Sequence, residues 1–229
     1  MVGVAESWPG ATLYRSTDSG TSYLPLVGQS VEGFAGHVAL LLPPPPVSHV
    51  VDDTNTIVVV MDHGTLLTTT DANILAGTGE NLVAIGGGNT WEILSFRTAT
   101  LIAENTYELS HLFRGRRGTE WATTAHVINT AFVVIDNGLT AVGMTLVDRY
   151  VVWPYKTVSV GQVLGDVTLV NFEPTAENLI PWTVIDQTDS IGAGGTWTLN
   201  WCYRSRFGGD WVDGVSVAVA FDLDFIGFE

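Results

Sequence analysis

The feature that most constrains the fold is the regular alternation of short β-forming runs with turn residues. Runs rich in β-branched and aromatic residues are interrupted by pairs such as His63-Gly64, Asn137-Gly138 and Asp213-Gly214. These pairs supply the positive φ angles that hairpin turns require. Turn signals spaced by about ten residues are typical of antiparallel sandwiches and barrels, so we predict an all-β chain. The predicted strands are residues 11–16, 22–27, 36–42, 56–61, 65–70, 81–85, 91–97, 106–109, 131–135, 140–146, 150–153, 167–170, 196–204 and 215–221.

Two local hairpins are predicted from this pattern. Residues 57–61 and 66–70 flank Asp62-His63-Gly64-Thr65, and residues 132–135 and 139–142 flank Asp136-Asn137-Gly138. Each pairing closes a short loop, which costs little conformational entropy.

One segment departs from the β pattern. Trp121, Ala125 and Ile128 recur near helical spacing after Thr119, a suitable N-cap, and Glu120 favours the amino end of a helix dipole. We therefore predict a short helical turn within residues 120–128.

Composition excludes several classes of partner. The chain has 229 residues, of which 46% are hydrophobic and 14% are charged, and its formal net charge is -15. Such an acidic chain repels nucleic acid phosphates and anionic membrane surfaces. The low charged fraction predicts a folded chain with much surface against other chains. Residues 1–20 lack the pattern of a secretory signal, and the longest apolar run, 38–42, is too short to span a bilayer.

An arginine-rich segment runs against this acidic background. Arg114, Arg116 and Arg117 are three of only nine Lys and Arg residues, and they surround Gly115 and Gly118. We expect these arginines on a tight, exposed loop. Two interpretations stay open: a solvated turn paired with acidic groups of the same chain, or a clamp, with Glu120, to carboxylates of a neighbouring subunit.

The same segment carries a resemblance to a known family. The pattern Leu109-Ser-x-Leu-Phe-Arg-Gly-Arg-Arg-Gly-Thr-Glu120 resembles a signature near the C-terminal end of the tail-tip hub proteins of siphophages and of gene transfer agents. Two further segments, 8–23 and Thr90-Trp-Glu-Ile-Leu-Ser-Phe-Arg97, resemble segments of the same region in the same order. The resemblance covers about residues 1–170. The family's hubs are several times longer, so the roles of their other parts are not carried over.

The resemblance and the composition together predict three regions. Residues 1–170 are expected to form a hub-like β domain, 171–195 a linker with two prolines, and 196–229 partial strands resembling a fibronectin-type-III module. A unit of two or three strands is marginally stable alone, so we expect it to dock on the first domain or on another subunit, with 215–228 as a buried strand. The tetraproline 43–46 is interpreted as a stiff spacer.

Signals for catalysis or metal binding are weak. The chain has no Gly-x-Ser-x-Gly elbow, no zinc-type His spacing, and no phosphate loop after Gly86-Gly-Gly88. The single Cys202 excludes an internal disulfide and is expected to be buried on a strand. We therefore predict no enzymatic activity, no cofactor and no metal.

Clustered carboxylates leave two weaker alternatives. A glycosidase needs a carboxylate pair, for which the candidates are Asp52, Asp53, Glu92, Glu104, Glu108 and Glu120. Asp52, Asp53 and Asn55 also carry the hard oxygen ligands that calcium prefers. A capped turn explains these three residues without a metal, and we favour that interpretation.

The chain contains eight tryptophans. Trp8, Trp153, Trp182 and Trp211 lie beside proline or glycine, where a ring is easily exposed, whereas Trp91 and Trp197 lie within predicted strands and are expected in the core. Exposed indoles stack on sugars, but aromatic residues are also enriched at protein interfaces, which we favour.

These observations predict a structural component of a phage or phage-like tail tip or baseplate hub. It is made in the host cytoplasm and resides in the virion, as a homo-trimer or ring that contacts other tail-tip proteins and helps in host attachment and tail-tip opening. The alternative is a receptor module that binds a host surface glycan. Neither function involves nucleic acid or direct membrane insertion.

Overall fold

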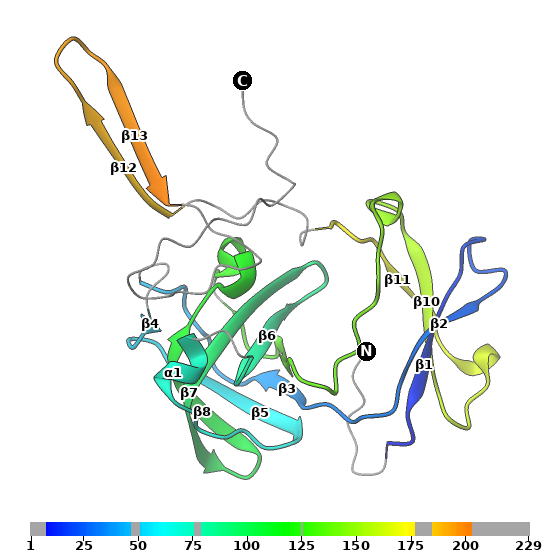
Figure 1. Ribbon diagram of the computed structural model, residues 1–229. Coiled ribbons are helices and arrows are strands. Elements are labelled where there is room, and N and C mark those ends of the chain that lie inside the picture. The colour runs from blue at the N-terminus through cyan, green and yellow to red at the C-terminus, as the bar shows by residue number, and fades with distance from the viewer. Residues whose placement is uncertain (1–7, 47–50, 76–78, 125, 177–184, 203–229) are drawn as a thin grey trace. The chain divides into compact units, whose positions relative to one another are not determined.

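The computed structural model describes residues 8–46, 51–75, 79–124, 126–176 and 185–202. The chain divides into two compact units, Met1–Thr175 and Ala176–Glu229. Nearly all of the regular structure is β, which confirms the predicted class (Figure 1).

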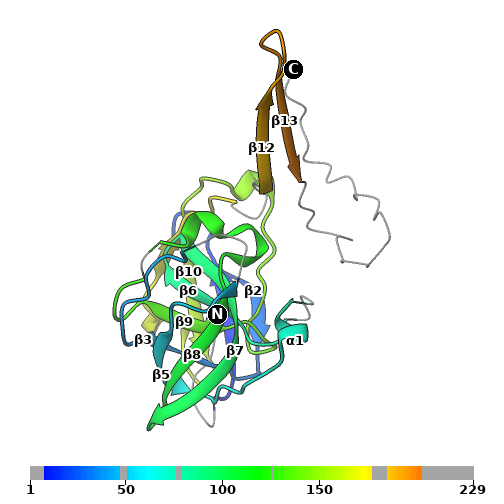
Figure 2. The same ribbon diagram turned by 90° about the vertical axis from the view of Figure 1, so that its left-hand side faces the viewer.

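A closed antiparallel barrel of six strands dominates the first unit. The strands follow the order β8-β5-β3-β9-β6-β7, and β7 pairs back with β8 to close the ring (Figure 2). A short strand, β4, also pairs with β8. The bounds are β3 (Ala35–Val38), β4 (Val51–Asp52), β5 (Ile57–His63), β6 (Leu82–Gly87), β7 (Thr90–Ala103), β8 (Thr106–Phe113) and β9 (Ala131–Val134).

Side chains at alternate positions fill the interior of the barrel. On β5 the buried residues are Ile57, Val59 and Met61, and on β7 they include Leu94 and Phe96. This period of two follows from the pleat, which turns successive side chains to opposite faces. A barrel of this size is filled by its own side chains, and its centre is therefore a packed core.

A second, four-stranded sheet belongs to the same unit. Its order is β11-β10-β1-β2, all antiparallel, with β1 (Ala11–Arg15), β2 (Leu24–Gln29), β10 (Trp153–Ser159) and β11 (Val170–Phe172). Within the described residues, helical structure is confined to one short helix and four single turns. These are α1 (Asp71–Leu75), η1 (Arg116–Gly118), η2 (Glu120–Ala122), η3 (Leu146–Asp148) and η4 (Leu164–Asp166).

In the second unit the structure describes one hairpin, β12 (Ile185–Ile191) with β13 (Trp197–Cys202). Because β12 lies inside residues 171–195, the prediction of a linker over that whole range is wrong. The strand-forming residues of β12 are followed by the glycine-rich residues 192–195, which form the turn of the hairpin. Cys202 ends β13, and the strand predicted at 215–228 lies outside the described residues.

Both predicted hairpins are wrong, although the turn residues do turn the chain. Strand β5 pairs with β3 and β8, and β9 pairs with β3 and β6. At the second turn Gly138 N–H donates to the Asp136 carboxylate. The predicted helical turn near Thr119 exists as η2, but it ends at Ala122, and His126 instead bridges to Leu42. Closing the barrel requires these distant pairings, which local turn chemistry does not encode.

Candidate functional site: a buried ionic cluster and the surface that it supports

The most strongly polar part of the barrel is a buried cluster of Asp52, Glu92, Arg114 and His126, which we call the ionic cluster. Glu92 points into the barrel because it shares the inward face of β7 with Leu94 and Phe96, and its side chain is fully buried. Its Oε1 atom accepts from Arg114 Nε at 2.5 Å, and its Oε2 atom accepts from Arg114 Nη2 at 2.7 Å. This two-pronged pairing is the strongest geometry available to an arginine and a carboxylate.

The Glu92 carboxylate accepts hydrogen bonds from two further donors. The Gly115 N–H donates to Oε1 at 3.1 Å, and His126 Nε2 lies 2.6 Å from Oε2. Because a carboxylate only accepts, His126 Nε2 carries the hydrogen. Burial raises the pKa of Glu92, but the hydrogen bonds and charges of Arg114 and His126 lower it by more, so that the net pKa lies below the ordinary range.

The ionic cluster joins three segments of the chain that are far apart in sequence. Arg114 directly follows β8, and its Nη1 donates to the Pro43 carbonyl at 3.0 Å. His126 forms a two-way backbone bridge with Leu42. Asp52 lies 3.8 Å from Arg114 Nη1. The cluster therefore fixes the start of the arginine segment, the residues before the tetraproline, and the chain around residue 126 at one end of the barrel.

The prediction of three exposed arginines is wrong for Arg114, which is 5% exposed. Arg116 is half-buried: its guanidinium lies over the Phe113 ring and donates to the Ile74 carbonyl and the Ser95 hydroxyl. Burial, together with the charge of Arg117, lowers the pKa of Arg116. Arg117 alone of the three is exposed, in a left-handed conformation with φ of 54°.

Glycine is required at the base of this loop. Gly115 has φ of 61°, and a Cβ there would lie 3.0 Å from Glu120 Cα and 3.0 Å from the Thr123 methyl. The tight turn therefore packs directly on η2, where Glu120 is half-buried and Trp121 is 49% exposed. The loop presents Arg117 and Trp121 to solvent on a fixed backbone.

Exposed aliphatic side chains surround the same end of the barrel. Backbone hydrogen bonds between Val38 and residues 129 and 130, and between Leu42 and His126, hold segments 38–42 and 126–130 antiparallel. Four large apolar residues on these segments are more than half exposed: Leu40, Leu41, Val127 and Ile128. We call the surface formed by Leu40, Leu41, Arg117, Trp121, Val127 and Ile128 the arginine pole.

Other predicted site residues lie elsewhere. Trp8 is half-buried before β1, and Trp153 is half-buried on β10 beneath the Arg15 guanidinium, 5.2 Å from its ring centre. Trp182 and Trp211 lie outside the described residues. Trp91 is only half-buried, on the face of β7 that points away from the core, and Trp197 is 62% exposed, so the prediction of a core position is wrong for both. Among the described residues of the second unit, no further strand covers the hairpin that carries Trp197.

Two of the three candidate calcium residues, Asp52 and Asn55, form a capped turn, whereas the Asp53 carboxylate contacts His111 Nδ1. Asp52 Oδ1 accepts from the backbone N–H groups of Thr54 and Asn55, and its Oδ2 accepts from the Asn55 amide. Within the described parts of the chain, no group of three or more His, Cys, Asp or Glu residues is arranged to hold a metal ion. Glu92 is sealed from solvent and engaged by four donors, which leaves it no access to an external glycan.

Part of the chain matches a known family. Residues 34–133 match the model of a family described as Rcc01698-like, C-terminal. The matched range starts beside β3 and ends within β9, so it spans the barrel and all four residues of the ionic cluster. No protein of curated function matches the chain. Among the described residues, no helix has the length and apolar character needed to cross a membrane.

Proposed function

We propose that this chain is a structural, non-enzymatic component of the tail tip or baseplate hub of a phage or phage-like particle, where it helps in host attachment and tail-tip opening. The proposal is supported by the arginine pole, where exposed Arg117 and Trp121 accompany four aliphatic side chains that are more than half exposed. Arginine and tryptophan are enriched among the side chains that dominate binding energy at protein interfaces, and burying aliphatic side chains adds apolar area. The pole is the surface by which the barrel docks on neighbouring tail-tip proteins.

The place of the signature residues supports this proposal. The segment Leu109–Glu120, which resembles the hub signature, forms the end of β8, the base of the ionic cluster and the loop of the arginine pole. Conformational freedom is removed from that loop before binding, because Arg114 and Gly115 both bind Glu92. A loop that is already ordered loses less conformational entropy when it docks.

The first test is whether the protein is part of a particle. Particles are purified from a host that produces the full chain, and the chain is sought by mass spectrometry and by cryo-electron microscopy. We expect density for the barrel at the distal end of the tail. Absence from purified particles, or a location on the capsid, would refute the proposal.

A surface variant tests the role of the pole in the same particles. Arg117→Glu with Trp121→Ala is expected to fold normally, because both side chains are exposed, and to lose incorporation into particles. Leu67→Ser is the matched control, since Leu67 is 73% exposed but lies beside the middle of β7, where Thr69 N–H donates to the Arg97 carbonyl. Normal incorporation of the pole variant would contradict the docking role.

One observation favours the alternative function, a receptor module that binds a host surface glycan. On the hairpin of the second unit, Trp197 and Trp201 lie on one face of β13, 62% and 44% exposed, and they line a groove of about 550 Å³ with Gln187 and Asp189. Indole faces flanked by polar groups suit a pyranose. Saturable binding on a glycan array that Trp197→Ala abolishes, with Trp121→Ala as the control, would support it.

A further inference from the structure

The barrel carries a second exposed surface, which differs in charge from the arginine pole. The hairpin between β7 and β8 exposes Leu101 (61%), Ile102 (52%), Glu104 and Glu108, which together we call the acidic tip. Within the described residues, neither glutamate side chain has a hydrogen bond or an ion pair. The hairpin is anchored to β5, because Met61 N–H donates to the Asn105 carbonyl. Leu101 is paired with Tyr107, whereas Glu108 is paired with Thr100, so Leu101 and Glu108 lie on opposite faces of the hairpin. Glu104 lies at the turn between the two strands, next to the exposed Leu101 and Ile102 in sequence.

Arg117 at the arginine pole is the complementary group. Six of the seven described cations have a hydrogen bond or ion pair within the chain: Arg15, Arg97, Arg114, Arg116, Arg149 and Lys156. Among the described cations, Arg117 alone has neither. The chain carries a net charge of -15, yet among the described residues no carboxylate forms an ion pair with this guanidinium.

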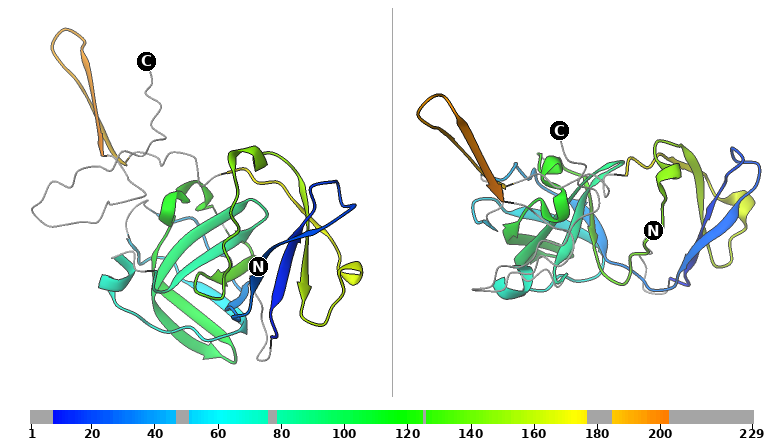
Figure 3. Two further views of the ribbon diagram at one scale, coloured as in Figure 1. Left: turned by 45° about the vertical axis from the view of Figure 1, so that its right-hand side comes forward. Right: turned by 45° about the horizontal axis from the view of Figure 1, so that its top comes forward.

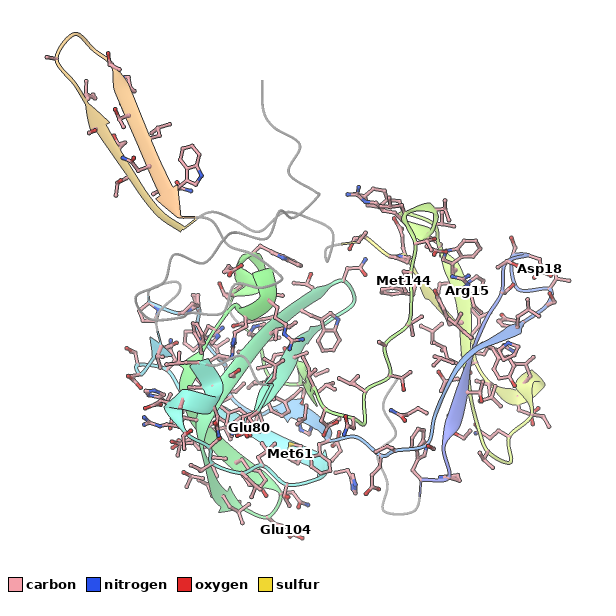
Figure 4. All side chains as sticks on the ribbon, viewed as in Figure 1. Arg15, Asp18, Met61, Glu80, Glu104 and Met144 are labelled. Atoms are coloured by element: carbon pink, nitrogen blue, oxygen red, sulfur yellow. The ribbon has the colours of Figure 1, made fainter. Side chains whose placement is uncertain are left out.

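The two surfaces lie at opposite ends of the barrel. On the β7–β8 ladder the acidic tip begins at Ala103 opposite Thr106, and Ser95 pairs with Phe113 beside the ionic cluster. Eight residues of strand separate these pairs, or about 26 Å. Strand β3 pairs antiparallel with β5 and leads away from the acidic tip toward Leu40 and Leu41. Figures 3 and 4 show the β7–β8 hairpin, with Glu104 labelled in Figure 4, at the end of the barrel opposite the helical turns of residues 116–122.

We propose that the arginine pole of one copy binds the acidic tip of a second copy of this chain. Leu101 and Ile102 pack on the aliphatic residues of the pole, and Arg117 pairs with Glu104 at the turn of the hairpin. Two copies with a net charge of -15 each repel one another at a distance, so self-association needs local charge complementarity of this kind. The inference rests on the proposed function, since it states how a structural subunit would contact its own copies.

This contact joins two different surfaces and is therefore heterologous. Each copy then offers a free acidic tip and a free arginine pole to further copies, which produces a closed ring or an open chain. A symmetric dimer would instead bury the same surface on both copies. The difference gives the proposal a signature that ordinary dimerisation lacks.

Two variants and their mixture test the contact in the full chain by native mass spectrometry and by light scattering after size exclusion. Arg117→Glu destroys the arginine pole, and Glu104→Arg with Glu108→Arg destroys the acidic tip. We expect the wild type to form assemblies of three or more copies at low salt, and each variant to weaken self-association by about tenfold or more. In an equal mixture of the two variants, the intact tip of one meets the intact pole of the other, and the reversed pole of one meets the reversed tip of the other. Opposite charges then face each other at both contacts, and we expect assemblies of three or more copies in which the two variants alternate.

Charge reversal in one chain completes the test. A variant with Arg117→Glu, Glu104→Arg and Glu108→Arg places opposite charges at both surfaces again and is expected to recover assembly. The inference is refuted by a wild type that stays monomeric at high concentration, by variants that assemble like the wild type, or by a mixture that fails to assemble. A wild type that stays monomeric in solution but is present in particles would refute the inference alone, whereas self-assembly of a chain absent from particles would refute the proposed function alone.

Discussion

Replacing Arg114 by methionine tests the energetics of the ionic cluster most directly. The substitution keeps much of the side-chain volume but removes two of the four hydrogen bonds to Glu92 and the charge that balances it. Breaking a buried ion pair by removing one partner costs about 3 to 5 kcal/mol. For a chain of this length each kcal/mol lowers Tm by about 2 to 4 °C, so we expect a fall of about 10 °C.

The double variant Arg114→Met with Glu92→Leu provides the control. It removes the charges of both residues and leaves two donors, His126 Nε2–H and Gly115 N–H, without their acceptor. Each buried donor that finds no other acceptor costs about 1 to 3 kcal/mol. Both variants take Arg114 away from Asp52, but only Arg114→Met also leaves the Glu92 carboxylate buried without its cation, so we expect the double variant to be more stable than Arg114→Met. A double variant whose loss equals or exceeds the sum of the two single losses would refute the view that these residues act as a pair.

The assay must separate the two units of the chain, because a single unfolding transition is not assured for such a protein. Hydrogen exchange of backbone amides in β7 and β8 reports on the barrel by itself, and urea titration followed by circular dichroism gives the free energy of unfolding. Both measurements are made on the wild type, the two single variants and the double variant.

The pH dependence of the same variants has a defined sign. In the wild type the pKa of Glu92 is below its ordinary value. The contribution of Glu92 to the stability of the fold is therefore fully present above its pKa in the unfolded chain, and it is lost as the pH falls through its pKa in the folded chain. In Arg114→Met, burial is no longer opposed by the guanidinium, and the pKa of Glu92 rises. We therefore expect the difference in free energy of unfolding between the wild type and Arg114→Met to become smaller as the pH falls from about 7 to about 5.

Three further predictions use other parts of the molecule. Hydrogen bonds from the Ser22 side chain and backbone and from the Ser16 side chain lower the pKa of Asp18 to about 2. The ionised Asp18 carboxylate therefore stabilises the fold above its unfolded pKa, and this stabilisation is lost as the pH falls through its folded pKa. An NMR titration of Asp18 with an ordinary midpoint would contradict this prediction. Gly36→Ala would push a Cβ into the Val60 carbonyl and Met61 Cα, so we expect urea unfolding to give a loss of about 1 to 3 kcal/mol, whereas Gly87→Ala, with open space around it, should change stability by under about 0.5 kcal/mol. Arg117→Glu should leave the free energy of unfolding within about 0.5 kcal/mol of the wild type, and a larger loss would mean that the guanidinium has a structural partner.

Part of the candidate site could be predicted from the sequence. The period of two along β7 places Glu92 on the same face as Leu94 and Phe96, and therefore inside the barrel, with Trp91 on the other face. Gly115 and Gly118 correctly indicated a turn. The pattern gave no sign that Arg114 leaves that turn and points inward, because arginine is mostly exposed and the carboxylate that holds it is 22 positions away.

The sequence by itself determined the β class, the positions of most turns and which side chains alternate inward, because each depends on neighbouring residues and the geometry of a single strand. The tertiary structure decided which strands pair. It moved β5 and β9 from their predicted local partners to distant ones, because a closed barrel leaves no edge unpaired. That closure also brought Glu92, Arg114 and His126 together, and with them the one exposed arginine of the loop.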